Sequence, residues 1–206
     1  MNSSKLSLDF YLQPTLKVAQ QILGKYIIHN VGRYRLVGKI VETEAYIGPY
    51  DLASHASRGK TQRNAVMFEK GGKIYVYLIY GMYYCLNIVT EAKDYPAAAL
   101  VRAVEPIEGI EPMWHNRYGD LKYDPENKKK IISLTNGPGK LCRAFGINQS
   151  FNGLDLGGER IYLAGGARVR AVEIAASKRI GVDYAKEYRN KPWRFHLKNN
   201  LFVSKI

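Results

Sequence analysis

Residues 74–89 read IYVYLIYGMYYCLNIV, and this stretch decides the fold class. Branched and aromatic side chains of this kind favour β-strands, and Gly81 interrupts the run near its centre. The pattern therefore predicts a β-hairpin that carries Tyr80, Met82 and Tyr83 at its tip. A pair of aromatic core strands is the ordinary explanation of such a run, but it does not explain large apolar side chains at an exposed tip.

The segments on either side of this hairpin extend the β pattern. Strands are expected at Tyr26–Val31, Tyr34–Glu44, Ala97–Glu105, Arg160–Leu163, Val169–Ile174 and Trp193–Leu197. Helices are expected at Pro14–Leu23, at Ile107–Tyr118 and from the glycine-rich turn Asn136–Lys140 through Phe145. The long polar stretch Ile47–Gly72 is expected to be a functional loop that contains a short helix.

These elements show no βαβ order, no repeat and no linker between domains. They predict a single α+β domain over residues 1–206. We expect a curved, mainly antiparallel sheet that is flanked by helices and carries a protruding hairpin.

The charge of the chain indicates a polyanionic partner. Its 31 lysines and arginines exceed its 18 aspartates and glutamates, which gives a net charge of +13. Such an excess favours phosphate binding, although a soluble protein with a basic surface is the plain alternative. The 16 tyrosines add weight to nucleic acid, because aromatic rings stack on unpaired bases.

Other features of the sequence concern its cellular location. No apolar run is long enough to span a bilayer, and residues 1–13 lack the apolar segment of a signal peptide. Cys85 and Cys142 are the two cysteines of the chain, and one pair does not make a disulfide framework. We therefore expect a reduced, cytoplasmic protein.

Two carboxylates and a tyrosine share one face of an expected strand. Glu42, Glu44 and Tyr46 alternate within an otherwise apolar segment. A water-exposed edge strand would tolerate them, whereas a carboxylate that activates a water is the functional alternative. Arg102 lies in a second apolar strand, where its charge needs a partner. That partner is either a purely structural carboxylate or the glutamate of a site.

The remaining motifs are weaker. The turn before Lys140 lacks the spacing of a nucleotide-binding loop, and we expect it to contact DNA backbone at most. The sequence contains no zinc-deaminase signature and no serine or cysteine nucleophile signature. We expect no metal and no cofactor, because the histidines lack metal-ligand spacing with either cysteine: His29, His55, His115 and His196.

Six stretches, in order and over nearly the whole chain, carry a family resemblance. They are VETEAYIGPYDLASHA (41–56), KTQRNAVMF (60–68), YVYLIYGMYYCLNIV (75–89), LVRAVEP (100–106), LTNGPGKLCRAFGI (134–147) and PWRFHLKNNLFVS (192–204). Together they resemble the alkyladenine DNA glycosylase family, the mammalian-type 3-methyladenine DNA glycosylases. The family's fold is similar to the C-terminal domain of formyltransferases. The chain lacks the N-terminal extension of vertebrate members, which matches a bacterial catalytic core.

The resemblance implies a role for each matching residue. Glu44 would be the general base that deprotonates the attacking water, and Arg102 would help to hold that water. The residues that would contact the extruded base are Tyr46, His55 and Tyr77, which sandwich it, and Asn87, which discriminates against guanine. At the DNA, Tyr80 would fill the gap in the base stack, as aromatic or apolar wedges do. Further contacts are implied for Met82 and Tyr83 in the minor groove, and for Arg63 and Lys140 near the pocket or the DNA backbone.

The resemblance also implies an activity. We expect a monofunctional, monomeric, nucleoid-associated enzyme of base-excision repair that acts on duplex DNA without a metal or cofactor. It would flip out alkylated or deaminated purines, namely 3-methyladenine, 7-methylguanine, hypoxanthine or ethenoadenine, and hydrolyse the N-glycosidic bond.

Three positions depart from the family pattern. They are Tyr50, Ser57 and Gln62, all in the pocket loop, and they affect substrate breadth rather than the general base. Two rival functions remain: a non-catalytic nucleic-acid-binding module of the same fold, and a formyltransferase-type modifier of carbohydrate or tRNA. The second rival lacks a recognisable formyl-donor site.

Overall fold

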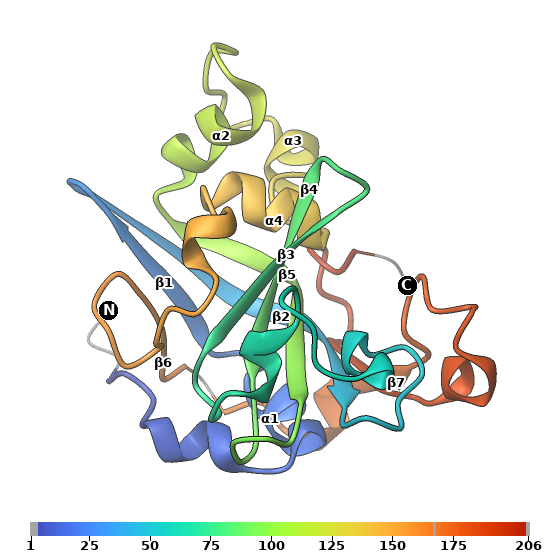
Figure 1. The fold of residues 1–206 in the computed structure, drawn as a ribbon. Helices are drawn as coiled ribbons and strands as arrows, with labels where there is room; N and C mark the ends of the chain where they lie inside the picture. Colours follow the sequence, from blue (N-terminus) through green and yellow to red (C-terminus); the bar gives the residue numbers. More distant parts are fainter. Residues whose placement is uncertain (1–3, 167, 205–206) are drawn as a thin grey trace.

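The computed structural model describes residues 4–166 and 168–204, and within them eight strands form one open antiparallel sheet (Figure 1). The order β3-β4-β5-β2-β1-β6 runs across the sheet; β8 also pairs with β2, and β7 pairs with β8. The strands are β1 (Tyr26–Val31), β2 (Tyr34–Ile47), β3 (Ile74–Ile79), β4 (Tyr83–Val89), β5 (Ala97–Glu108), β6 (Ile161–Ala164), β7 (Ile174–Ser177) and β8 (Arg194–Leu197). The predicted α+β class with a mainly antiparallel sheet is confirmed.

The helices are short, and residues of α1, α2 and α4 pack into one main core against the sheet. They are α1 (Thr15–Gln21), α2 (Ile110–Tyr118), α3 (Lys128–Ile132) and α4 (Pro138–Ala144). In Figure 1, α1 lies at the bottom of the view, against β2 and β5, while α2, α3 and α4 lie towards the top. Six 3-10 helices complete the described elements: Leu8–Leu12, His55–Arg58, Ala65–Phe68, Gln149–Phe151, Ala171–Glu173 and Lys186–Asn190. None of the helices in the described ranges is long and apolar enough to cross a membrane.

The central strand β2 positions the polar residues of the ETEAY motif. It pairs with β1 and β5, and its middle also pairs with β8 through Glu42, Thr43 and Glu44. The register against β5 shifts on both sides of Glu42, as at a β-bulge, which bends a strand locally. Both glutamates are therefore fully buried in the interior of the sheet. The alternative of a water-exposed edge strand is wrong.

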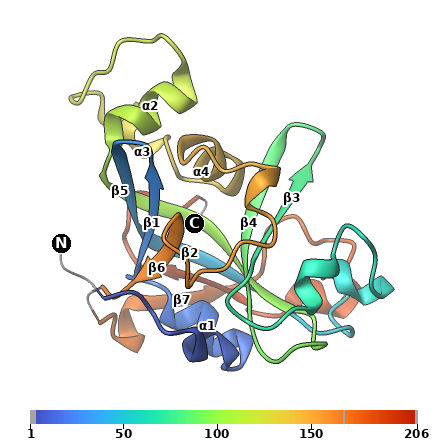
Figure 2. The ribbon, with the colours of Figure 1, turned by 60° about the vertical axis from the view of Figure 1, so that its left-hand side comes forward.

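The predicted hairpin is confirmed as β3–β4. Met82 N–H donates to the carbonyl of Ile79 (3.2 Å), and Tyr80 and Gly81 between them both have positive φ. This geometry is that of a type I′ turn, whose twist matches the strands it joins. Figures 1 and 2 show the hairpin projecting from the sheet beside α4. The Tyr80 side chain is 80% exposed.

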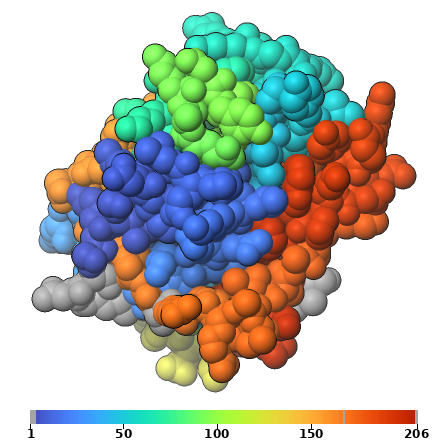
Figure 3. All heavy atoms as spheres, turned by 90° about the horizontal axis from the view of Figure 1, so that it is seen from below, coloured from blue at the N-terminus to red at the C-terminus, as the bar shows by residue number. Residues whose placement is uncertain are grey.

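Distant parts of the sequence meet on the side opposite the hairpin. Seen from below, the N-terminal segment in blue lies beside the orange and red C-terminal third (Figure 3). Leu6 N–H donates to the carbonyl of Leu163 (2.9 Å), and Lys5 forms an isolated bridge with Ala164. The main core under these segments is built from large apolar side chains such as Tyr11, Trp114 and Phe145.

The structure corrects several predicted boundaries. The strand expected at Val169–Ile174 is wrong: residues 171–173 form a 3-10 helix and β7 begins at Ile174. The cause is local, because the Glu173 carboxylate accepts from the backbone N–H of Arg170 (2.8 Å) and closes a turn. Strands β2 and β5 are each three residues longer than predicted, and the basic stretch after Asp120 continues into α3. Both cysteines are buried and free.

A candidate active site in a cavity beside the hairpin

A cavity of about 650 Å³ opens beside the β3–β4 hairpin. Strands β2 to β5, the loop around His55, the start of α4 and residues 180–184 contribute to its walls. Eight of the residues singled out from the sequence line it: Tyr46, His55, Tyr77, Tyr80, Tyr83, Asn87, Arg102 and Lys140. Met82, next to the turn of the hairpin, and Arg63, over the ring of Tyr77, are not among the residues that line the cavity.

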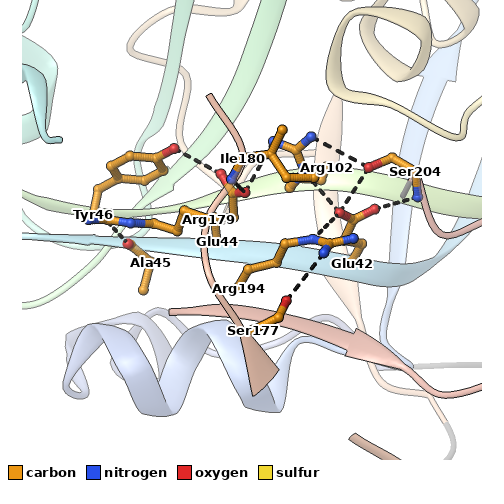
Figure 4. Close-up of polar contacts among 10 residues, drawn as sticks. All are labelled: Glu42, Glu44, Ala45, Tyr46, Arg102, Ser177, Arg179, Ile180, Arg194 and Ser204. Atoms are coloured by element: carbon orange, nitrogen blue, oxygen red, sulfur yellow. Dashed lines mark hydrogen bonds and ion pairs between the residues drawn. The ribbon is translucent and has the colours of Figure 1, made fainter. Parts of the chain in front are cut away.

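Glu44 lies directly behind this cavity, held by three donors (Figure 4). Its Oε2 accepts from the Tyr46 hydroxyl (2.8 Å), and its Oε1 accepts from the Ile180 N–H (2.8 Å). Arg102 Nη1 lies 3.2 Å from the same Oε1. The three donor residues all line the cavity, whereas the Glu44 side chain is fully buried. The carboxylate is thus fixed one side chain below the cavity surface.

A second carboxylate fixes the arginine. Glu42 Oε1 accepts from Arg102 Nε (2.9 Å) and Arg194 Nε (2.7 Å), and Ser204 donates to both oxygens of Glu42. Burial raises the pKa of Glu42, but the Arg102 charge and these hydrogen bonds outweigh it and hold that pKa below its usual value. Burial likewise lowers the pKa of Arg102, and Glu44 and Glu42 more than reverse this effect. Arg102 therefore has a structural partner in Glu42, and it also contacts Glu44 and lines the cavity.

A buried ion pair behind Tyr46 was not predicted from the sequence. Arg179 donates to both carboxylate oxygens of Asp51, and neither side chain is exposed. The Arg179 guanidinium also stacks on Tyr46, 4.7 Å from the ring centroid, and donates to the carbonyl of Ala45 (2.9 Å). It precedes Ile180, whose N–H contacts Glu44. The one hint of this ion pair in the sequence was that Asp51 lies within the VETEAYIGPYDLASHA stretch.

Aromatic rings form one wall of the cavity. His55 Nδ1 lies 2.9 Å from the Tyr75 hydroxyl, and the centroids of His55 and Tyr77 are 4.4 Å apart. Arg63 lies over the ring of Tyr77, 5.6 Å from its centroid, and donates to the carbonyl of Leu78 (2.8 Å). Partial burial and then the positive charge of Arg63 lower the pKa of His55. Burial raises the pKa of Tyr75 to about 12.

These charges predict that the His55 imidazole is neutral at pH 7. Its titration, followed by the NMR signals of the histidine ring, should have a midpoint below the ordinary value of 6.5. Arg63→Gln should move the midpoint upward, because it removes a positive charge that disfavours protonation. Since the folded pKa is the lower one, folding stability falls as the pH drops below 6.5. A midpoint at or above 6.5 in the wild-type protein would contradict this description.

Polar groups complete the floor and the rim of the cavity. Asn87 donates to the carbonyl of Tyr75 (3.1 Å), which fixes its amide against the floor. Cys85 beside it has a pKa raised to about 11 by burial, so its thiol stays protonated at neutral pH. At the rim, the Tyr184 hydroxyl donates to the carbonyl of Ala53 (3.3 Å), a contact that the sequence did not reveal.

The three positions that depart from the family pattern lie in the loop between β2 and β3. Tyr50 is exposed, and Gln62 is exposed in the turn before Arg63. Ser57 donates to the carbonyl of Ser54 (2.8 Å) within the 3-10 helix that carries His55. Within the described ranges, no group of three or more His, Cys, Asp or Glu side chains is placed to hold a metal ion.

The fold and the site together define a class of protein. An α+β domain places a cavity with aromatic walls over a buried carboxylate, next to a projecting aromatic hairpin. This arrangement suits an enzyme that takes up a planar ring and acts on a bond next to it.

Comparisons with known proteins agree with this class. Residues 9–201 match the methylpurine-DNA glycosylase family. A protein of Clostridium novyi (strain NT) is 48% identical over 202 residues, which cover 98% of each chain. A protein of Methanocella arvoryzae is 50% identical over 199 residues, covering 96% of this chain and 94% of the relative. Each is named "Putative 3-methyladenine DNA glycosylase".

The chain therefore belongs to the methylpurine-DNA glycosylase family. The sequence-based prediction of a monofunctional DNA glycosylase of base-excision repair is confirmed, and so is DNA as its substrate.

Proposed function

We propose that this glycosylase flips an alkylated or deaminated purine out of duplex DNA into the cavity and hydrolyses its bond to deoxyribose. The observation that carries the proposal is the position of Glu44. Its carboxylate is held by Tyr46, Ile180 and Arg102 directly beneath a cavity with aromatic walls. Arg102 already has a buried carboxylate partner in Glu42, so Glu44 is not required to neutralise it.

The walls of the cavity suit a purine base. His55 and Tyr77 present rings on one side, and Tyr46 presents its ring from β2. Stacking on such rings offsets part of the few kcal/mol that unstacking a nucleotide costs. The fixed amide of Asn87 would crowd the 2-amino group of guanine. The pocket would therefore favour 3-methyladenine, hypoxanthine and ethenoadenine, and would accept 7-methylguanine because its bond to the sugar is already weak.

The chemistry requires one water and one proton acceptor. A water in the cavity, held by both Glu44 and Arg102, would attack C1′ as the bond from C1′ to the purine nitrogen breaks. The bonding electrons leave with the base, and Glu44 takes the proton of the water. The negative carboxylate also stabilises the positive charge that develops on the sugar. A cationic alkylated base leaves without further help, whereas hypoxanthine takes a proton from solvent. The product is an abasic site in an unbroken strand.

The projecting hairpin would hold the DNA open during this reaction. Tyr80, at the type I′ turn, is the most exposed aromatic residue of the tip, and Met82 is 65% exposed beside it. A wedge of this kind fills the space that the flipped nucleotide leaves in the stack. Tyr83, 43% exposed, lies between this tip and the cavity and would contact the minor groove.

Tyr80→Ser is expected to weaken capture of the flipped nucleotide, because serine cannot fill the gap in the stack. Loss of one stacked ring corresponds to about 1–3 kcal/mol, and we expect a roughly tenfold slower single-turnover excision. The matched control is Tyr34→Ser in the β1–β2 hairpin, whose ring is also exposed. Equal rates for Tyr80→Ser and the wild type would rule out the wedge role.

The proposal also covers the domain organisation of the protein, its oligomeric state, its DNA partner and its location in the cell. We propose that residues 1–206 act as a single domain and as a monomer, because one cavity and one hairpin suffice for one lesion. The net charge of +13 supports phosphate-dominated binding of duplex DNA. In a bacterial cell this partner would place the enzyme at the nucleoid.

A labelled duplex tests the proposed function. One duplex carries hypoxanthine and a second carries an alkylated adenine, each incubated with the protein in EDTA and then treated with hot alkali. Strand cleavage after alkali alone supports a metal-free glycosylase and begins to rank the substrates. Cleavage before alkali would contradict the unbroken product strand. No cleavage of either duplex, with folded protein that binds DNA, would favour the non-catalytic binding module.

A further inference from the structure

Arg179 holds a fully buried guanidinium group next to the cavity (Figure 4). Its Nη1 donates to Asp51 Oδ2 and to the carbonyl of Ala45 (2.9 Å), and its Nη2 donates to Asp51 Oδ1 (2.8 Å) and to the carbonyl of Tyr188 (3.3 Å). Its Nε has no acceptor within the described residues. The acceptors come from β2, from the loop after it and from the 3-10 helix of Tyr188, and together they fix the plane of the guanidinium.

On one side, these contacts reach the loop that carries His55. Asp51 Oδ2 also accepts from the N–H of Ile47 (3.2 Å), and its Oδ1 accepts from the N–H of Ala53 (3.1 Å). An aspartate that accepts from the N–H two residues ahead closes a tight turn. Arg179 therefore binds a carboxylate that already fixes the chain between the end of β2 and His55.

On the other side, the contacts of Arg179 reach the donors that hold Glu44. The guanidinium lies over the ring of Tyr46, 4.7 Å from its centroid, and the hydroxyl of that ring donates to Glu44 Oε2 (2.8 Å). Arg179 is also followed directly by Ile180, whose N–H donates to Glu44 Oε1 (2.8 Å). Arg102 supplies the third contact, from β5. Two of the three groups that hold Glu44 therefore depend on the position of Arg179.

Stability alone is a weak reason for a buried ion pair at this place. Apolar residues of similar volume often stabilise a protein as well as such a pair does, and fixing one geometry is the better-attested use of the pair. Apolar contacts among Ala53, Val182 and Ala185 already join the same two segments. What Arg179 adds is direction, because it sets the Tyr46 ring and the N–H of the next residue relative to the carboxylate between them.

We propose that Arg179 is a positioning residue of the excision reaction, which acts through Tyr46 and Ile180 on the carboxylate of Glu44. The inference rests on the proposed function, since it concerns the group that takes the proton from water. Arg179 is fully buried and does not line the cavity, so it contacts neither the base nor the sugar. Its replacement therefore affects the chemical step and leaves capture of the lesion unchanged.

Arg179→Lys tests this role. Lysine keeps the positive charge beside Asp51, but it lacks the flat, forked group that stacks on Tyr46 and reaches several acceptors at once. Single-turnover excision from a hypoxanthine duplex should slow by roughly 10- to 100-fold, the size of effect expected when a catalytic group is displaced by about 1 Å. Affinity for a duplex whose lesion carries a 2′-fluorinated sugar, which resists cleavage, should stay within about twofold of the wild type.

A double-mutant cycle with Tyr46→Phe shows whether Arg179 acts through Glu44. Tyr46→Phe removes the hydroxyl that donates to Glu44 and keeps the ring. Because both residues place the same carboxylate, the two losses should be less than multiplicative, and the double variant should excise at about the rate of the slower single variant. Losses that multiply would mean that the two residues act independently, which would overturn the inference.

The matched control is Arg160→Lys, because Arg160 also lies over an aromatic ring, that of Phe151, 4.2 Å from its centroid and outside the cavity. This control should excise at the wild-type rate. Asp51→Asn repeats the test from the other partner of the ion pair, so the result does not depend on the folding of Arg179→Lys alone. A wild-type rate in either folded variant, or equal losses of rate and affinity, would overturn the inference. Failure of the proposed function is distinguishable, because the wild type would then release no base from the hypoxanthine duplex.

Discussion

Glu44→Gln is expected to slow excision of a damaged purine by roughly 10²- to 10⁴-fold, the usual contribution of a general base. Glutamine has the size of glutamate, and its amide oxygen can still accept from Ile180 and Arg102 at the position of Oε1. Its amide nitrogen faces the Tyr46 hydroxyl, which can accept in turn. The pocket is therefore preserved while the group that takes the proton from water is lost. Single-turnover kinetics with a hypoxanthine duplex measure the effect.

Binding separates catalysis from damage to the fold. The Glu44→Gln protein should bind the lesion duplex as tightly as the wild type, because no contact to the base is removed. The control is Glu105→Gln on β5, where the carboxylate pairs with Lys39 outside the cavity. That control should excise at the wild-type rate. Undiminished excision by Glu44→Gln would refute the assignment of the base.

Asp51→Ala is expected to lower the free energy of unfolding by about 3–5 kcal/mol, the range for removing one partner of a buried ion pair. Both side chains of the Asp51–Arg179 pair are fully buried, so the substitution leaves a guanidinium without its carboxylate. The Asp51 carboxylate also accepts from the backbone N–H groups of Ile47 and Ala53, and both lose that acceptor. Urea unfolding, followed by tryptophan fluorescence, measures the change.

A second aspartate provides the comparison. Asp155 pairs with Lys73 at a partly exposed site, with 43% of its side chain accessible. Asp155→Ala should cost no more than about 1 kcal/mol, as exposed pairs do. Equal losses in Asp51→Ala and Asp155→Ala would show that the buried pair is not a main support of the site. The stacking of Arg179 on Tyr46 would then need another explanation.

Local chemistry made some of this architecture predictable. Gly81 between two aromatic β segments specified the turn, because a type I′ turn needs positive φ at its central residues. Alternation put Glu42, Glu44 and Tyr46 on one face, and the contacts of Arg102 with both glutamates and of Tyr46 with Glu44 confirm it. The spacing could not show whether that face was wet or buried, because burial depends on which strands flank β2.

Long-range partners could not be predicted. Asp51 and Arg179 are 128 residues apart, and nothing in the residues around either one indicates the other. The error at Val169–Ile174 had a local cause, since apolar alternation there resembled a strand while the Glu173 carboxylate closes a turn.

Release of free base from a duplex with one hypoxanthine, measured by mass spectrometry, tests the role of Glu44 in base excision most directly. Wild-type protein, Glu44→Gln and an undamaged duplex are compared in parallel. We predict free hypoxanthine from the wild type, with the strand unbroken, and essentially none from Glu44→Gln or from undamaged DNA. Release at the same rate by Glu44→Gln, or none by folded wild-type protein that binds both this duplex and one with an alkylated adenine, would contradict it.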